Sequence, residues 1–225
     1  MAKTASLQKT APRQRVSAYW SLLMLAGLRG EPDNRLMSES PIVDGWHSSA
    51  RRCESPNANE RPEHRTPELI VVHNISLPPG KFGTGDIEAL FCNRLDCSAD
   101  PFYEELIGLE VSSHFLIDRD GAVTQFVSTD RRAWHAGRST YAGRTECNDF
   151  SIGIELEGTD TLPYSEAQYR TLADLIADLR IFYPGLAGGG IAGHSDIAPG
   201  RKTDPGPAFD WALLRRMLAG SRANP

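Results

Sequence analysis

The segment Leu69–His73 constrains the fold of this 225-residue chain more than any other. Its residues, LIVVH, are apolar and mostly β-branched, and they lie between Pro67 and the Pro78-Pro79-Gly80 breaker. A short apolar run bounded by turn signals is typical of a strand that is buried on both faces of a sheet. The run therefore predicts a central strand with a histidine at its carboxyl end.

Three other segments predict neighbouring strands. Residues His114–Ile117 and Ala122–Val127 flank an Asp120-Gly121 turn, which is a strong signal for a β-hairpin. Residues Ser151–Leu156 alternate small or polar residues with isoleucine and leucine, so one face of this strand should pack in the core. Glu155 then lies on the other face.

Helices are predicted by apolar periodicity and by end signals. In Ser165–Tyr183, apolar residues recur at three- and four-residue spacing, the opening Ser-x-x-Gln forms a capping box, and Pro184-Gly185 ends the pattern. Shorter helices are expected at Asp86–Asn93 and Phe209–Ala219. Strands mixed with helices indicate an α/β domain with a mixed central β-sheet flanked by helices.

Two stretches carry weaker signals. Residues 47–68 are polar and rich in proline, which predicts an irregular lead-in to the folded core. Gly188–Gly193 spells G-x-G-x-x-G, but it follows a predicted helix end rather than a strand. A loop before a short strand is therefore favoured over a nucleotide site.

The first 36 residues differ in composition from the rest. Residues 1–30 hold five basic side chains and no acidic one. Their apolar run, Ala18–Leu28, is too short to span a bilayer, which takes roughly 20 apolar residues. We expect residues 1–36 to be a disordered basic extension before a start at Met37, with an export signal as the alternative. Residues 37–225 should form a single domain.

The charge balance excludes one broad class of function. The chain carries 24 basic and 29 acidic residues, for a net charge of −5. It therefore has no general attraction for a phosphate backbone or an anionic membrane surface. We expect neither nucleic-acid binding nor stable membrane association.

The four cysteines form no C-x-x-C pair and indicate reduced thiols rather than a disulfide framework. Cys92 and Cys97 are close enough in the sequence to close a small loop if the protein met an oxidising compartment. Their spacing does not suit zinc.

Three potential metal ligands follow rigid or tightly turned segments. His73 ends the LIVVH run, His194 follows the glycine-rich loop, and Asp204 lies in the turn RKTDPGP. Two imidazoles and one carboxylate suit a catalytic zinc site, in which three protein ligands leave the fourth position to water. From this pattern alone, both histidines could also be hydrogen-bonded core residues. His114 and His135, which have apolar neighbours, are expected to be core residues of that kind.

Five motifs carry a resemblance to a known family. The segments at 71–80, 112–121, 132–137, 147–160 and 193–211 are VVHNISLPPG, SSHFLIDRDG, RAWHAG, CNDFSIGIELEGTD and GHSDIAPGRKTDPGPAFDW. They resemble the AmpD-type 1,6-anhydro-N-acetylmuramyl-L-alanine amidases of the N-acetylmuramoyl-L-alanine amidase type 2 family. The resemblance implies the α/β fold shared by peptidoglycan recognition proteins and phage T7 lysozyme.

The resemblance also implies roles for particular side chains. His73, His194 and Asp204 match the zinc ligands of the family. Glu155 matches the residue taken as general base, and Lys202 matches the lysine beside the metal. These roles fit the chemistry, because zinc activates water, a carboxylate can take the proton, and a lysine can stabilise a developing oxyanion. Without the resemblance, Glu155 could be a solvated strand residue and Lys202 a surface charge.

Asn74 and Trp134 match residues near the substrate groove of the family, and the resemblance leaves a supporting role for His135 open beside that of a core residue. The implied reaction is hydrolysis of the amide between the lactyl group of a muramic acid and the L-Ala of its stem peptide. We expect a monomeric, cytoplasmic enzyme that acts on small anhydromuropeptides during cell-wall recycling. The alternatives are an exported amidase acting on intact peptidoglycan and a non-catalytic peptidoglycan-binding module.

Overall fold

The computed structural model describes residues 40–62 and 65–220. The expected extension at residues 1–36 and the expected start at Met37 lie outside these described residues. None of the helices in the described ranges is both long and apolar enough to cross a membrane.

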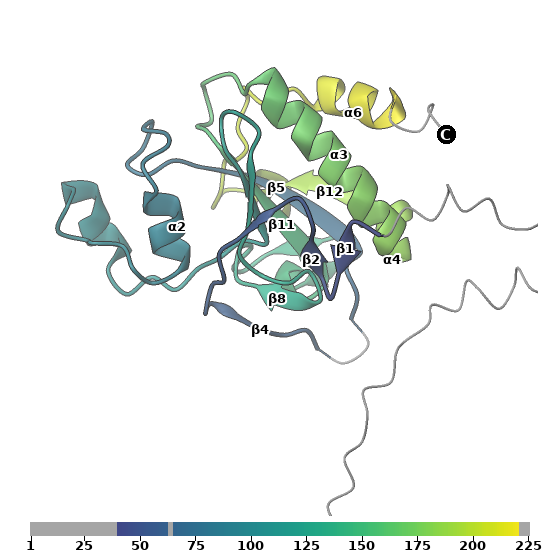
Figure 1. The fold of residues 1–225 in the computed structure, drawn as a ribbon, viewed down its shortest axis with the longest axis horizontal. Helices are drawn as coiled ribbons and strands as arrows, with labels where there is room; N and C mark the ends of the chain where they lie inside the picture. The colour runs from purple at the N-terminus through teal and green to yellow at the C-terminus, as the bar shows by residue number, and fades with distance from the viewer. Residues whose placement is uncertain (1–39, 63–64, 221–225) are drawn as a thin grey trace, which may run out of the picture. The chain divides into compact units, whose positions relative to one another are not determined.

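A six-stranded mixed sheet forms the centre of the fold (Figure 1). In spatial order its strands are β12 (Gly190–Gly193), β5 (Leu69–Ile75), β11 (Ser151–Glu157), β6 (Phe115–Ile117), β7 (Val123–Gln125) and β3 (Arg51–Arg52). Strand β5 pairs in parallel with both β12 and β11, and β6 pairs antiparallel with β7. The predicted central strand and hairpin are confirmed, although β5 continues two residues beyond His73.

Helices α3 (Glu166–Phe182) and α6 (Trp211–Gly220) cover one face of this sheet (Figure 1). The buried stripe of α3 packs against alternate residues of β5 and β11, among them Val72 and Ile154. Ser165 caps α3 in the predicted capping box with Gln168. The long helix predicted from periodicity is therefore confirmed, and so is the final helix.

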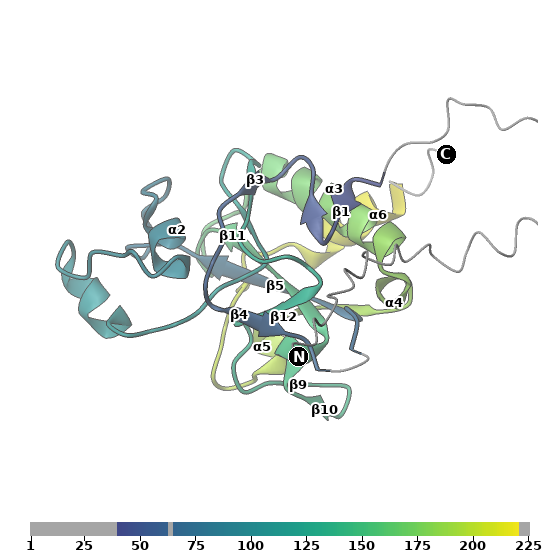
Figure 2. The same cartoon turned by 60° about the horizontal axis from the view of Figure 1, so that its bottom comes forward.

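The opposite face of the sheet carries a smaller apolar cluster and the polar side chains described below. The cluster contains Leu69 and Val71 of β5, together with Phe150 and Ile197. Short elements surround this face, and Figure 2 shows three of them close together: α5 (His194–Ile197), β9 (Thr140–Tyr141) and β10 (Arg144–Thr145). Because successive side chains of a strand alternate between faces, residues 69, 71 and 73 share this side.

The remaining elements lie around the sheet. Helix α2 (Asp86–Phe91) confirms the helix predicted there, and it ends two residues before the predicted end. The others are β1 (Ile42–Val43), β2 (Trp46–His47), β4 (Ala58–Glu60), β8 (Arg131–Ala133), α4 (Pro184–Ala187) and the 3₁₀ helices η1 (Pro101–Leu106) and η2 (Cys147–Asp149).

The prediction that residues 47–68 are irregular is wrong in part. Strand β3 joins the main sheet beside β7, and β4 pairs with β8. These strands contribute mostly exposed polar side chains, so they lack the apolar alternation by which a strand is recognised. Helix α3 ends before Pro184-Gly185 as predicted, and Pro184 then occupies the first turn of the separate short helix α4. The last four residues of the glycine-rich run form β12.

We expect Leu172→Ala to lower the free energy of unfolding by about 2–5 kcal/mol, because Leu172 is fully buried where α3 packs on the sheet. The matched control is Ile181→Ala on the same helix, where the side chain is 76% exposed. Its effect should stay within about 0.5 kcal/mol. Urea unfolding followed by circular dichroism measures both values, and similar losses in the two variants would contradict the packing of α3.

Candidate metal centre and active site

Three side chains from separate segments converge near the carboxyl end of β5. His73 lies on β5, His194 begins α5 directly after β12, and Asp204 lies in the turn that follows. Nδ1 of His73 is 3.0 Å from Nδ1 of His194, and both nitrogens are 3.1 Å from Oδ2 of Asp204. The two histidines are buried and Asp204 is partly buried. This group could hold a metal ion through three protein ligands.

The imidazole of His194 is oriented by a bond on its far side. Its Nε2 lies 3.2 Å from the backbone carbonyl oxygen of Ala136. A carbonyl oxygen only accepts, so this contact favours the tautomer with the proton on Nε2 of His194 and the lone pair on Nδ1. Nη2 of Arg201 lies 3.5 Å from the same Nε2 and donates to the carbonyl of Ala136 at 2.7 Å. In this tautomer, the nitrogen that faces His73 and Asp204 is the one able to bind a metal.

The imidazole of His73 is oriented in the same way through His135. Ser151 Oγ donates to the carbonyl of Cys147 at 2.6 Å, so it accepts from Nε2 of His135 at 3.2 Å. Burial lowers the pKa of His135 well below its usual range, which keeps this ring neutral. Nδ1 of His135 then accepts from Nε2 of His73 at 2.9 Å, and Nδ1 of His73 is left with its lone pair.

The Nδ1 atoms of both histidines and one carboxylate oxygen thus lie at about hydrogen-bond distance from one another. Burial lowers the pKa of His73 to about 4, so this imidazole is neutral near pH 7. Two neutral imidazoles and a carboxylate could bind a cation between them. Metal-binding histidines commonly donate their second ring N–H to a neighbouring acceptor in the way that His73 and His194 do.

Glu155 lies beside His73 because the parallel register of β5 and β11 pairs these two residues. Its Oε2 is buried and has no hydrogen-bond partner in the part of the chain that the structure describes. Burial raises the pKa of Glu155 well above its usual range; the charge of Asp204 adds to the shift, and Lys202 opposes it. A buried carboxylate oxygen without a hydrogen-bond donor is unfavourable. A water molecule bound by a metal ion at this site would supply the missing donor.

A groove of about 430 Å³ opens over this cluster. One wall is apolar and comes from α2, η1 and the segment after η1, with Leu90, Phe91, Phe102, Leu106 and Leu109. All seven side chains predicted from the sequence line the groove: His73, Asn74, Trp134, Glu155, His194, Lys202 and Asp204. The structure brings these side chains together, while their individual roles stay predictions.

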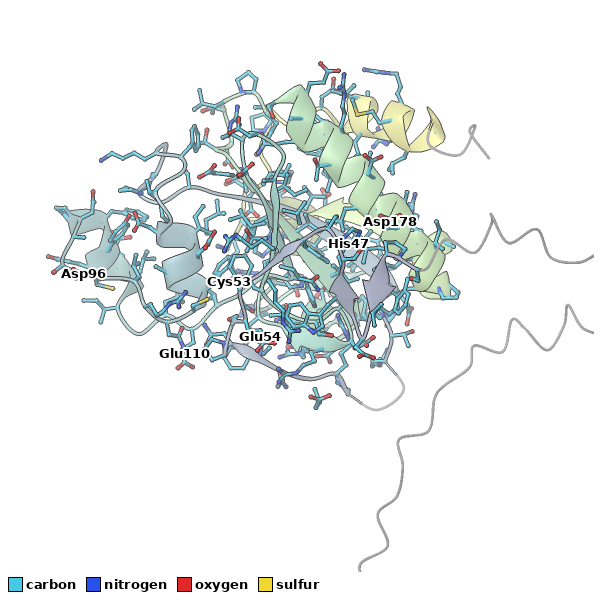
Figure 3. The ribbon with its side chains drawn as sticks, viewed as in Figure 1. His47, Cys53, Glu54, Asp96, Glu110 and Asp178 are labelled. Carbon is cyan, nitrogen blue, oxygen red and sulfur yellow. The ribbon has the colours of Figure 1, made fainter. Side chains whose placement is uncertain are left out.

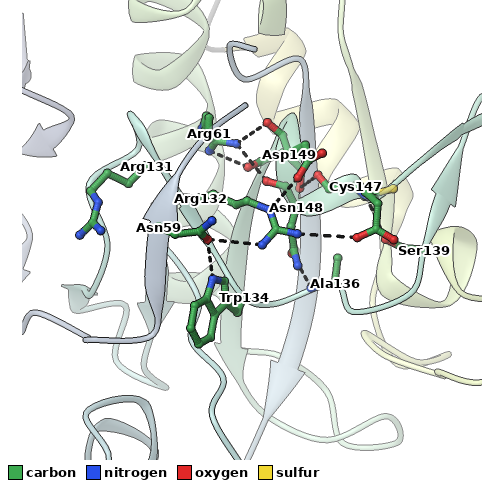
Figure 4. Close-up of polar contacts among 12 residues, drawn as sticks. Asn59, Arg61, Arg131, Arg132, Trp134, Ala136, Ser139, Cys147, Asn148 and Asp149 are labelled. Atoms are coloured by element: carbon green, nitrogen blue, oxygen red, sulfur yellow. Dashed lines mark hydrogen bonds and ion pairs between the residues drawn. The ribbon is translucent and has the colours of Figure 1, made fainter. Parts of the chain in front are cut away.

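The two predicted substrate contacts are themselves anchored. Asn74 donates through Nδ2 to Oδ1 of Asp160 at 2.8 Å. Trp134 donates through Nε1 to Oδ1 of Asn59 at 2.7 Å (Figure 4). Both side chains therefore have their polar groups engaged, and their remaining surface is available to the groove.

Figure 4 also shows the contacts that hold the segment bearing His135 and Ala136. Oδ1 of Asn148 accepts the backbone N–H groups of His135 at 3.2 Å and of Ala136 at 2.8 Å. Arg61 donates to the carbonyls of Asn148 and Asp149, both at 3.1 Å. Burial lowers the pKa of Arg61 to about 10, and these carbonyl acceptors compensate its desolvation. The acceptors for both candidate metal ligands are thus fixed by a buried polar network.

Local sequence patterns do not indicate this supporting network. His114 and His135 are buried, as predicted for core residues, but His135 also contacts His73. Arg61 lies in the segment predicted to be irregular. Asn148 belongs to one of the five motifs, and its inclusion there is the one sequence signal that could have drawn attention to it.

A family model described as N-acetylmuramoyl-L-alanine amidase matches residues 63–207, which include the convergent histidines, Asp204 and Glu155. The chain belongs to the N-acetylmuramoyl-L-alanine amidase family. It is 57% identical over 178 residues to the 1,6-anhydro-N-acetylmuramyl-L-alanine amidase AmpD of Escherichia coli K12. The aligned region covers 79% of this chain and 97% of that protein. The AmpD of Haemophilus influenzae is 44% identical, with 76% of this chain and 92% of that protein covered.

Solved structures support the same assignment to the amidase family. A crystal structure of a selenomethionine AmpD derivative matches with a TM-score of 0.77 and 54% identity, covering 79% of this chain and 98% of that one. An endolysin amidase from Clostridium intestinale, 17% identical with a TM-score of 0.54, covers 76% of this chain and 95% of its own and shares the fold alone. The predicted α/β amidase fold, the resemblance to AmpD-type enzymes and the amidase class are confirmed. The alternative of a non-catalytic module is rejected.

Gly153 provides a test of the support given by His135. A Cβ atom on Gly153 would lie 2.5 Å from Cγ of His135. We expect Gly153→Ala to destabilise the amidase by about 1–3 kcal/mol, and to weaken metal binding by about tenfold or more, since the ring that orients His73 must shift. Thermal unfolding and metal titration measure the two effects.

The control for this variant is Gly188→Ala. A Cβ atom there meets no other atom within 4 Å, so stability and metal affinity should stay at the parent values. If Gly153→Ala bound metal as tightly as this control, metal affinity would not depend on the position of His135.

Proposed function

We propose that this amidase is a zinc enzyme that hydrolyses the lactyl–L-Ala amide of 1,6-anhydro-N-acetylmuramyl peptides in cell-wall recycling. One observation carries the zinc assignment: the Nδ1 atoms of two imidazoles and a carboxylate oxygen lie about 3 Å from one another. Nitrogen ligands with one carboxylate, and with space for water, suit catalytic zinc. The ligands would be His73, His194 and Asp204.

When bound, zinc supplies two effects, a water molecule with a pKa near neutrality and polarisation of the scissile carbonyl. The protein must then move a proton and stabilise charge. Glu155 is proposed as general base, because its Oε2 is buried and lacks a partner beside His73. The same carboxyl group can return the proton to the leaving amine of L-Ala.

Lys202 is proposed to stabilise the developing oxyanion. It lines the groove two residues before Asp204, and its charge opposes the upward shift in the pKa of Glu155. A fixed positive charge near the site where negative charge develops lowers the barrier of an acyl-transfer reaction. Asn74 and Trp134 are proposed to contact the substrate along the groove wall.

The substrate class rests on the relatives. Those with the highest identity named above are 1,6-anhydro-N-acetylmuramyl-L-alanine amidases, and this chain spans nearly their whole length. We accordingly propose a small, soluble muropeptide as substrate, a cytoplasmic location and a monomeric enzyme. We propose that the catalytic domain is residues 37–225, which include the groove and all seven of its predicted side chains.

Removing any ligand should remove the metal. We expect His73→Ala, His194→Ala and Asp204→Ala to lose both zinc and activity, because three ligands are the minimum for a catalytic site with an open position. Glu155→Gln should keep zinc but lose about 10²–10⁴-fold in kcat. Elemental analysis of the purified proteins and turnover assays measure these effects. Full zinc content in any ligand variant, or near-normal kcat in Glu155→Gln, would show that the assignment of that residue is wrong.

A comparison of substrates tests the physiological role. We expect the zinc-loaded full-length protein to release stem peptide from an anhydromuropeptide and to leave intact sacculi undigested. Product analysis by mass spectrometry measures both reactions under the same conditions. Digestion of sacculi at a comparable rate would instead favour the alternative of an exported amidase, while the family assignment would stand.

A further inference from the structure

The structure brings together two cysteines that are distant in the sequence. Sγ of Cys53 lies 3.4 Å from Sγ of Cys92, although 39 positions separate them. Both side chains are partly exposed, so small reagents can reach them. Cys97 is the cysteine nearest to Cys92 in the sequence, but Sγ of Cys97 contacts the carbonyl of Leu95. Cys147 is buried on the other side of the sheet from α3.

The backbone around the two sulfur atoms is held in place from both sides. The N–H of Cys53 donates to the carbonyl of Gln125 at 2.9 Å, which ties this segment to the end of β7. Ser55 Oγ donates to the carbonyl of Phe91 at 2.5 Å, directly before Cys92. Asn57 and Asn93 exchange two side-chain bonds at 2.8 and 3.0 Å. The two cysteines are therefore held near each other by contacts that do not involve sulfur. Figure 3 shows Cys53 on the side of the sheet that faces α2.

The electrostatic surroundings distinguish the two thiols. Nη2 of Arg94 lies 3.8 Å from Sγ of Cys53, so a positive charge is available to a thiolate at this position. Burial raises the pKa of Cys92 to about 11, and the contact with Cys53 adds to this shift. Cys53 is thus the better placed of the two to react first with an electrophilic sulfur reagent.

We propose that Cys53 and Cys92 are a redox-modification site that closes reversibly to a disulfide when the protein meets a small-molecule disulfide. The thiolate of Cys53 attacks one sulfur of the reagent, forming a mixed disulfide as the reagent's S–S bond breaks and one thiolate leaves. Cys92, on losing its proton, attacks the sulfur of Cys53 and expels the second reagent thiolate. The two protein thiols are oxidised by two electrons, and the reagent is reduced to two thiols.

The disulfide bond between Cys53 and Cys92 would close a loop that contributes residues to the groove. The closed loop runs from residue 53 to residue 92 and contains β5 with His73. Leu90 and Phe91, which precede Cys92, lie in the apolar wall of the groove. Cross-linking a loop of this length should raise the melting temperature by roughly 5–15 °C, mainly by restricting the unfolded chain.

The test is oxidation of the reduced, full-length protein with excess oxidised glutathione, followed by alkylation of free thiols and tryptic peptide mapping without reductant. Cleavage after Arg94 places Cys92 and Cys97 on different peptides, so each linkage is identified by its own mass. We expect a peptide containing Cys53 to be linked to one containing Cys92, with a higher melting temperature. Dithiothreitol should reverse both changes.

Two matched variants complete this test. Cys97→Ser should form the same cross-link, and Cys53→Ser should form none and show no rise in melting temperature. A link between Cys92 and Cys97 would overturn the proposal, as would free thiols or stable mixed disulfides at residues 53 and 92. The experiment uses neither metal nor substrate, so its outcome is independent of the proposed amidase function.

Discussion

The parallel pairing of β5 with β11 is the interaction on which the site depends. It places His73 directly beside Glu155 on one face, while Val72 and Ile154 point into the core beneath α3. If β11 shifted by one residue relative to β5, Glu155 would turn toward α3 and Ile154 would turn away from it, so Glu155 and His73 would lie on opposite faces. Burial of apolar side chains on one face of the sheet therefore fixes the position of His73 and Glu155 on the other face.

Because the site is buried, polar atoms without partners are energetically unfavourable there. His73, His194 and Glu155 are nearly inaccessible, and Asp204 is only partly exposed, yet their polar atoms converge. Such a group is stable only if each polar atom has a partner, because an unpaired buried acceptor is unfavourable by about 1–3 kcal/mol. Ala136 and His135 provide partners on the outer side of the imidazoles. The inner side is left for a cation and its water, so metal binding and stability of this region should be coupled.

Much of the fold could be predicted from short-range patterns. The run LIVVH, the Asp-Gly hairpin and the capped helix at Ser165 were recognisable because their signals are local: apolar periodicity, turn residues and end caps. The strands β3 and β4 were missed for the complementary reason. Their side chains are mostly exposed and polar, and they are strands only because β7 and β8 offer backbone partners.

By itself, the sequence determined the order of the motifs, the chemical nature of the candidate ligands and, through the resemblance, the family. It could not determine distances, because these depend on how segments far apart in the chain pack together. The tertiary structure alone decided that His135 orients His73, that Arg61 and Asn148 hold the supporting segment, and that Cys53 rather than Cys97 lies beside Cys92. Each of these contacts joins residues whose neighbours in the sequence give no sign of the other, so only the packing of the sheet against its surrounding loops could create it.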